Sequence, residues 1–170
     1  MISSLIGMFY TIAIGFSIGG LMISRRMMPT RLQVFLVTLF FAFAVYIGIV
    51  ISRLFEKVIA LQFIEILVGL VVLATIALAF INFHPMMGYF HQQSRVLWGI
   101  LFLLFFLFGM EWTIREASIW LHFVSIGFFY FSILIGQLIQ YEVLQKIWRV
   151  EYVSYLPLVY LLLIAIFKIF

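Results

Sequence analysis

Residues 58–81 read VIALQFIEILVGLVVLATIALAFI, an apolar stretch whose only ionisable side chain is Glu65. At 1.5 Å per residue a helix of this length measures about 36 Å, enough to cross a bilayer core of about 30 Å. Comparable stretches fill the rest of the chain, which is 67% hydrophobic and 9% charged with a mean hydropathy of +1.29. We therefore predict an all-α integral membrane protein, a bundle of about six transmembrane helices that forms one domain over residues 1–170.

Short charged clusters and prolines divide the chain into segments of membrane-spanning length. We expect helices over Ile2–Ser24, Gln33–Arg53, Val58–Ile81, Val96–Glu111, Ser118–Gln137 and Tyr152–Phe170. Pro29 and Pro85 fall in the breaks after the first and third helices, where proline ends a helix. Residues 140–150 are amphipathic, with an apolar face and a charged face, which predicts a short helix lying in the membrane interface.

The distribution of charge favours one orientation across the membrane. We call side A the side of the first, third and fifth connections, and side B the side of the termini and the other two connections. Side A holds the whole formal net charge of +4. Because cytoplasmic loops are rich in Lys and Arg, we expect loops 25–31 and 139–151 to be cytoplasmic in a plasma (inner) membrane, with both termini outside. Trp112 and Trp120, near side B, are typical of an aromatic belt at the interface.

The first helix carries a stripe of small residues at every fourth position. The small-residue stripe consists of Ser3, Gly7, Thr11, Gly15 and Gly19. Positions four apart share one helix face, and small side chains there let a second backbone approach closely. The stripe predicts close helix packing, either within the chain or against a partner subunit or a second copy.

The fifth helix carries a polar lane along one face. It consists of Ser118, His122, Ser125, Ser132, Gly136 and Gln140, and it is interrupted by Phe129. Such a lane indicates either hydrogen bonding between helices or the lining of a cavity or substrate path.

The third helix contains a carboxylate about two turns from its side B end. Gln62 and Glu65 share a face, and an ionisable residue at this depth is a functional candidate because it must be paired, protonated or hydrated. Arg115 and His122 approach from the same side. Since Glu111 and Arg115 stand four residues apart and can pair with each other, we expect His122 to be the partner of Glu65 in a polar, proton-binding pocket.

No motif for catalysis or for a cofactor emerges. Residues 15–19 match the G-x-S-x-G string of hydrolases, but that motif requires a strand-to-helix turn, and these residues lie within a predicted transmembrane helix. The chain lacks cysteine, which excludes thiolate metal sites and disulfides. We predict no catalytic residue, no metal site and no cofactor, with a haem between His84 and His91 as a weaker alternative.

Two hypotheses about function lead. The first is a non-catalytic subunit of a larger membrane complex, which binds other membrane subunits or a second copy through the first helix. The alternative is transport, by a carrier or channel for a small solute or proton that uses the Glu65 and His122 site. A redox or haem-binding subunit is weaker. The net positive charge is attributed to membrane orientation and to contact with anionic lipid headgroups. The expected partner is therefore the lipid bilayer, and no nucleic acid is expected to bind.

Overall fold

The computed structural model describes residues 2–24, 29–55, 60–84, 88–90, 95–115, 118–146 and 151–169. It contains six α-helices that are long and apolar enough to cross a membrane, in agreement with the predicted all-α bundle. The elements are α1 (Ile2–Met22), α2 (Arg31–Phe55), α3 (Leu61–Ile81), α4 (Arg95–Ile114), α5 (Ile119–Lys146), the short 3-10 helix η1 (Glu151–Tyr155) and α6 (Leu156–Ile169).

The start of α2 shows why a helix begins where it does. The backbone N–H of Thr30 donates to Oε1 of Gln33 at 2.8 Å, and the N–H of Gln33 donates to Oγ1 of Thr30 at 3.3 Å. This reciprocal capping satisfies two N–H groups that the first turn leaves without helical partners. As a result α2 begins at Arg31, two residues before the predicted start at Gln33.

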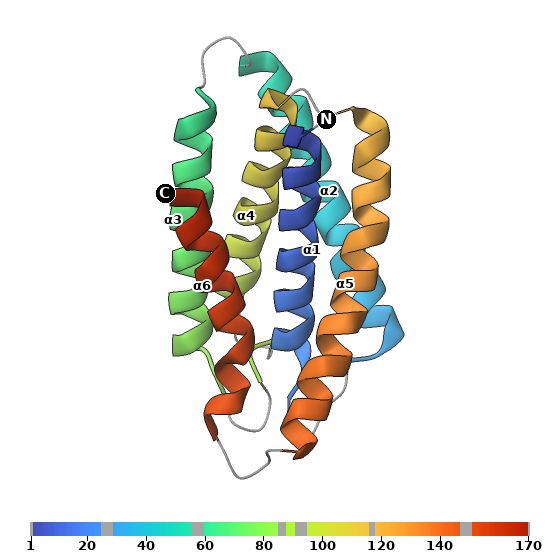
Figure 1. Cartoon of the computed structure of the whole chain (residues 1–170), viewed down its shortest axis with the longest axis vertical. Helices are drawn as coiled ribbons and strands as arrows, with labels where there is room; N and C mark the ends of the chain where they lie inside the picture. The colour runs from blue at the N-terminus through green and yellow to red at the C-terminus, as the bar shows by residue number, and fades with distance from the viewer. Residues whose placement is uncertain are drawn as a thin grey trace.

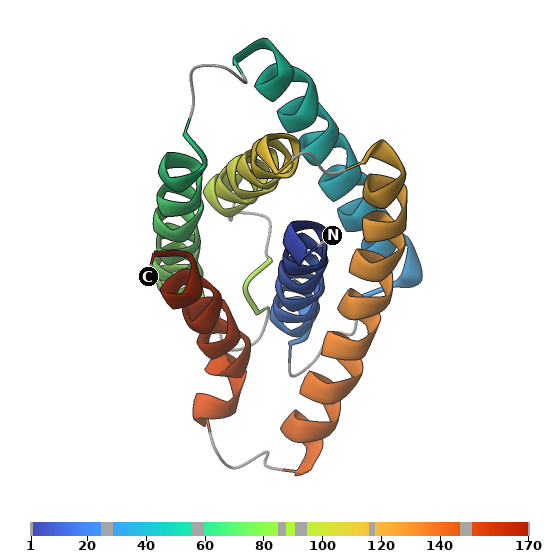
Figure 2. The ribbon, with the colours of Figure 1, turned by 45° about the horizontal axis from the view of Figure 1, so that its top comes forward.

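The six helices pack as a closed ring. The main contacts run from α2 to α4, α3, α6, α1 and α5, and then from α5 back to α2. Figure 1 shows successive helices running up and down, so that both termini lie at side B. In Figure 2, α1 and α4 lie between the two flanks of the bundle, with α3 and α6 on one flank and α5 on the other.

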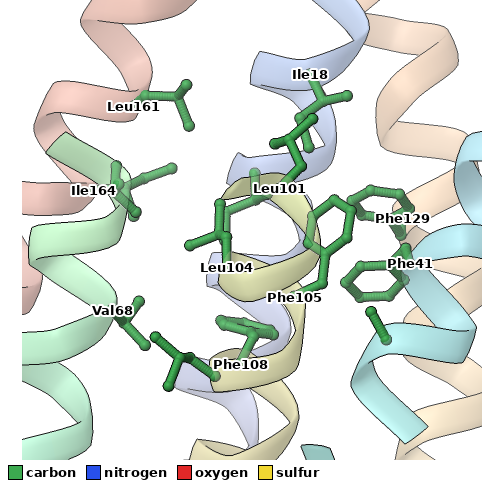
Figure 3. Packing of buried hydrophobic residues seen from close by; sticks show 14 of the residues in the cluster. Ile18, Phe41, Val68, Leu101, Leu104, Phe105, Phe108, Phe129, Leu161 and Ile164 are labelled. Carbon is green, nitrogen blue, oxygen red and sulfur yellow. The ribbon is translucent and has the colours of Figure 1, made fainter. Parts of the chain in front are cut away.

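Apolar side chains fill the interior of the ring (Figure 3). The rings of Phe41 and Phe129 are stacked, with centroids 3.9 Å apart, and Phe105 packs edge-on against Phe129 at 5.6 Å. We call these three residues the phenylalanine stack. Around it lie buried aliphatic side chains from α1, α3, α4 and α6, which include Ile18, Val68, Leu101, Leu104, Leu161 and Ile164. Large apolar residues such as Phe43, Leu70 and Phe131 cover the outer surface, as expected of faces in contact with lipid.

An aromatic cluster closes the side A end. Tyr89, in the connection between α3 and α4, is buried and donates from its hydroxyl to the backbone oxygen of Ser154 at 2.8 Å. Its ring lies 4.9 Å from that of Phe83, which in turn lies 5.0 Å from Tyr155. Burial raises the pKa of Tyr89, and the neighbouring Tyr155 adds a smaller rise, so the hydroxyl remains a donor.

The predicted interfacial helix is wrong over residues 140–146, which continue α5 without a break as far as Lys146. No proline or glycine interrupts this tract after Gly136. Gln140 is buried, and its side-chain amide donates to the backbone oxygen of Val153 at 2.9 Å, which ties the end of α5 to η1. Residues 147–150 lie outside the described part of the chain.

Candidate functional site

The small-residue stripe is used mainly inside the chain, between α1 and α5. A Cβ atom on Gly15 would lie 3.0 Å from the backbone oxygen of Phe129, and one on Gly19 would overlap the backbone of Ile133. Gly7 instead faces the Trp112 ring of α4, and the Thr11 hydroxyl donates to the Gly7 backbone oxygen at 3.0 Å. The Ser3 side chain lies outside the described residues. Gly15 and Gly19 therefore offer no free face to a second chain.

The half of the polar lane toward side A, which holds Ser132, Gly136 and Gln140, packs against α1. A Cβ atom on Gly136 would overlap the backbone oxygen of Phe16, so the two helices are in backbone contact here. His122, Ser125, Ser132 and Gln140 are buried, whereas Ser118 at the start of the lane is exposed. The Ser125 hydroxyl donates to the His122 backbone oxygen at 2.7 Å. From Ser132 to Gln140 the lane is thus packed against a neighbouring helix of the same chain.

Four charged side chains from three helices meet near side B, and we call them the charged cluster: Glu65, Glu111, Arg115 and Lys168. Nε of Arg115 donates to Oε1 of Glu111 at 2.8 Å, while its Nη2 donates to Oε1 of Glu65. Nζ of Lys168 donates to the same Glu111 oxygen. The Lys168 ammonium also lies over the ring of Tyr10, 4.0 Å from its centroid, so α1 contributes a fourth wall.

Burial within the charged cluster increases from its edge inward. The Glu65 and Arg115 side chains are 27% and 11% exposed, whereas those of Glu111 and Lys168 are 1% and 2% exposed. Two carboxylates and two cations make the cluster formally neutral. Removing ions from water is unfavourable unless they are paired with good geometry and further hydrogen bonds, and each member of the cluster has an oppositely charged partner.

Glu65 pairs with Arg115 rather than with His122, which corrects the sequence-based expectation. That expectation assumed that pairing with Glu111 would occupy Arg115, but a guanidinium carries five N–H donors and serves both carboxylates at once. His122 lies on α5, and Figures 1 and 2 place α3 and α5 on opposite flanks of the ring. Gln62 is exposed, one turn before Glu65.

Lys168 belongs to the site but was not predicted as a member, because its charge was assigned to the C-terminal end of the last helix on side B. A signal was present in the sequence. Leu161, Ile164 and Ala165 form the buried face of α6, and Lys168 continues that face at the same helical spacing. A lysine on the apolar face of a transmembrane helix requires a buried carboxylate partner, and Glu111 is that partner.

Three buried polar atoms have no hydrogen-bond partner among the described residues: Glu111 Oε2, Trp112 Nε1 and His122 Nδ1. Trp112 was predicted to join an interfacial belt, but its ring is buried against α1, while Trp120 is exposed. Within the described ranges, His, Cys, Asp and Glu side chains form no group of three that could hold a metal ion. His84 is exposed beside the start of the connection between α3 and α4, and His91 is outside the described residues.

The chain matches no family model, and no curated protein or solved structure is significantly similar to it.

Proposed function

We propose that this chain is a non-catalytic subunit of a larger membrane complex in the plasma (inner) membrane. The observation that carries the proposal is that apolar side chains fill the middle of the ring around the phenylalanine stack. Two patterns could have lined a passage, and the small-residue stripe and the polar lane from Ser132 to Gln140 instead pack against neighbouring helices of the chain. The charged cluster, in turn, is paired internally and joins α3, α4 and α6. Such a bundle is suited to act as a rigid scaffold.

A partner of this scaffold would bind its outer surface. The first helix remains the proposed contact, but through a different face from the small-residue stripe. Leu5, Phe9 and Ile12 are exposed at spacings of four and three, so they form a ridge on the outside of α1. Large apolar side chains on a membrane helix pack against another helix as readily as against lipid, so this ridge suits a second subunit or a second copy of the chain.

Photo-crosslinking in native membranes tests the subunit proposal. A photoreactive amino acid at Phe9 should give a discrete crosslinked protein, and native mass spectrometry in mild detergent should give the same stoichiometry. The matched control is Leu70, which is exposed on α3 and lies away from the proposed ridge. Crosslinking to lipid alone from both positions, with a monomer as the only species in the spectrum, would exclude a stable complex.

The second candidate function is transport of a small solute or proton, and the charged cluster favours it. Buried ionisable residues mark ion and proton paths in many membrane proteins, and Glu65 connects this cluster to the surface. Reconstitution into liposomes with an internal pH-sensitive dye tests this function. Proton flux that is abolished by Glu65→Gln would replace the subunit proposal with a carrier, whereas flux equal to that of empty liposomes would eliminate this candidate.

A further inference from the structure

The three buried polar atoms without described partners all belong to the side B end of the bundle. Glu111 and Trp112 lie in the last turn of α4, and His122 lies in the first turn of α5. The charged cluster lies at the same end. Uncompensated polar atoms are rare in folded proteins, so their occurrence together at one end points to a common partner.

Trp112 and His122 face the interior at a similar depth. Trp112 follows Phe105 by seven residues, and His122 precedes Phe129 by seven. Seven residues make about two helical turns and return a side chain to nearly the same face, with a drift of about 20°. Because α4 and α5 run in opposite directions (Figure 1), these spacings place both residues on the side B side of the phenylalanine stack.

Residues of α1 and α2 also lie at this level, and the one from α2 is polar. The Trp112 ring lies against Gly7 of α1, where a Cβ atom would come 3.1 Å from Nε1. The buried Ser52 hydroxyl of α2 donates to the backbone oxygen of Met110, one turn from the end of α4. The free indole N–H is a donor, and the free imidazole nitrogen is a donor or an acceptor according to its tautomer. Water both donates and accepts hydrogen bonds, so it can serve as the hydrogen-bond partner of the indole and of the imidazole.

We propose that the bundle is hydrated from side B down to the phenylalanine stack, and that water bound there hydrogen-bonds Trp112 and His122. The three packed rings of the stack are the proposed lower limit of this hydrated site. The proposal stands whether the chain is a subunit or a carrier, since it concerns which part of the interior water reaches.

Two serines on one face of α5 provide a matched test. Ser125 and Ser132 stand seven residues apart in the polar lane, both are buried, and Phe129 lies between them. The chain has no native cysteine, so Ser125→Cys and Ser132→Cys each create the only thiol. The protein in lipid nanodiscs is treated with a small water-soluble methanethiosulfonate reagent. We expect Ser125→Cys to react at least about tenfold faster, a ratio that corresponds to about 1.4 kcal/mol. Equal rates would overturn the proposal.

A second measurement on the wild-type protein decides the question if either variant fails to fold. With ¹⁵N-labelled indole, the Trp112 Nε1–H signal is assigned by its loss in Trp112→Phe, and its cross-relaxation with water and its exchange in D₂O are recorded. We expect a cross-peak with water and exchange without unfolding. A Trp112 indole that shows no water cross-peak and exchanges only on global unfolding would rule out hydration at this level.

Discussion

One oxygen of Glu111 accepts hydrogen bonds from two cations that belong to different helices. Arg115 comes from the same helix, one turn later, and Lys168 comes from α6. Glu111 is therefore the residue through which α4 holds the end of α6. Glu111 and Lys168 are both almost fully buried, so removing the charge of one leaves the charge of the other without compensation in an apolar environment.

We predict that Lys168→Met lowers the free energy of unfolding by about 3–5 kcal/mol, because it breaks a buried ion pair from one side. Adding Glu111→Gln should recover part of this loss, since the double variant carries no unpaired carboxylate. The measurement is reversible unfolding by SDS in mixed micelles.

The matched control for Lys168→Met is Lys146→Met. Lys146 pairs with Glu142 at 3.6 Å on the exposed surface of α5, and such a pair contributes at most about 1 kcal/mol. Strictly additive losses in Lys168→Met and Glu111→Gln would contradict the coupling between the two residues.

Tyr89 links the connection between α3 and α4 to η1 through one hydrogen bond. Tyr89→Phe removes the donor to the Ser154 backbone oxygen and should lower the free energy of unfolding by about 1 kcal/mol. Because the pKa of Tyr89 is raised, its hydroxyl is protonated at neutral and moderately alkaline pH, and the loss should be the same at both. Tyr152→Phe is the control, because Tyr152 is 80% exposed. An equal loss in both variants would show that the Ser154 hydrogen bond contributes nothing.

At the scale of the elements, the α1–α5 pair depends on glycines that bring two backbones together. The register that results sets Gly15 and Gly19 beside Phe129 and Ile133, so the helices run in the same direction. This arrangement also places Phe129 against Phe41 of the neighbouring α2. The close contact of α1 and α5 therefore helps to form the phenylalanine stack as well as the helix pair.

We predict that Gly19→Ala destabilises the bundle by about 1–3 kcal/mol, because the added Cβ overlaps the Ile133 backbone and the helices must separate. Gly127→Ala is the control on the same pair of helices. A Cβ atom there meets nothing within 4 Å, and replacing glycine in a helix should be neutral or stabilising. Unfolding in SDS measures both variants. No loss of stability in Gly19→Ala would mean that the two helices do not pack through this glycine.

The sequence predicted which segments form helices better than it predicted which helices pack against each other. Hydropathy located all six spans, and the four-residue spacing of small residues correctly indicated a close helix contact. The end of α5 was missed because the amphipathic pattern of 140–150 is compatible with an interfacial helix or with a continued one. In the structure α5 runs unbroken to Lys146, which shows that the helix continues.

The composition of the site was predicted in part. Glu65, Glu111 and Arg115 were identified from their depth and spacing, and the structure brings them together. His122 was assigned to them because it enters from the same side, but depth along the membrane says nothing about position around the ring. That position is set by which helices are neighbours, and it depends on packing between segments that are distant in sequence.

At the scale of the whole molecule, the two ends of the bundle differ in how they use charge. At side B the charged cluster neutralises itself within the protein. At side A, the basic side chains of Arg31, Arg95 and Lys146 are exposed. Once Arg115 and Lys168 of the charged cluster are set aside, side B keeps two basic residues, Arg53 and Lys57, against six on side A. Because cytoplasmic loops are rich in Lys and Arg, this difference favours a cytoplasmic side A.

We therefore predict that side A is cytoplasmic, with loops 25–31 and 139–151 inside and both termini outside. Ser118 and Gln145 are exposed at opposite ends of α5, so single cysteines at these positions report on the two sides of one helix. In intact cells a membrane-impermeant maleimide should label Ser118→Cys, whereas Gln145→Cys should be labelled only after permeabilisation. The reverse pattern would invert the orientation. Labelling of both positions in intact cells would show that α5 does not span the membrane, since a spanning helix separates its ends by the whole hydrocarbon core.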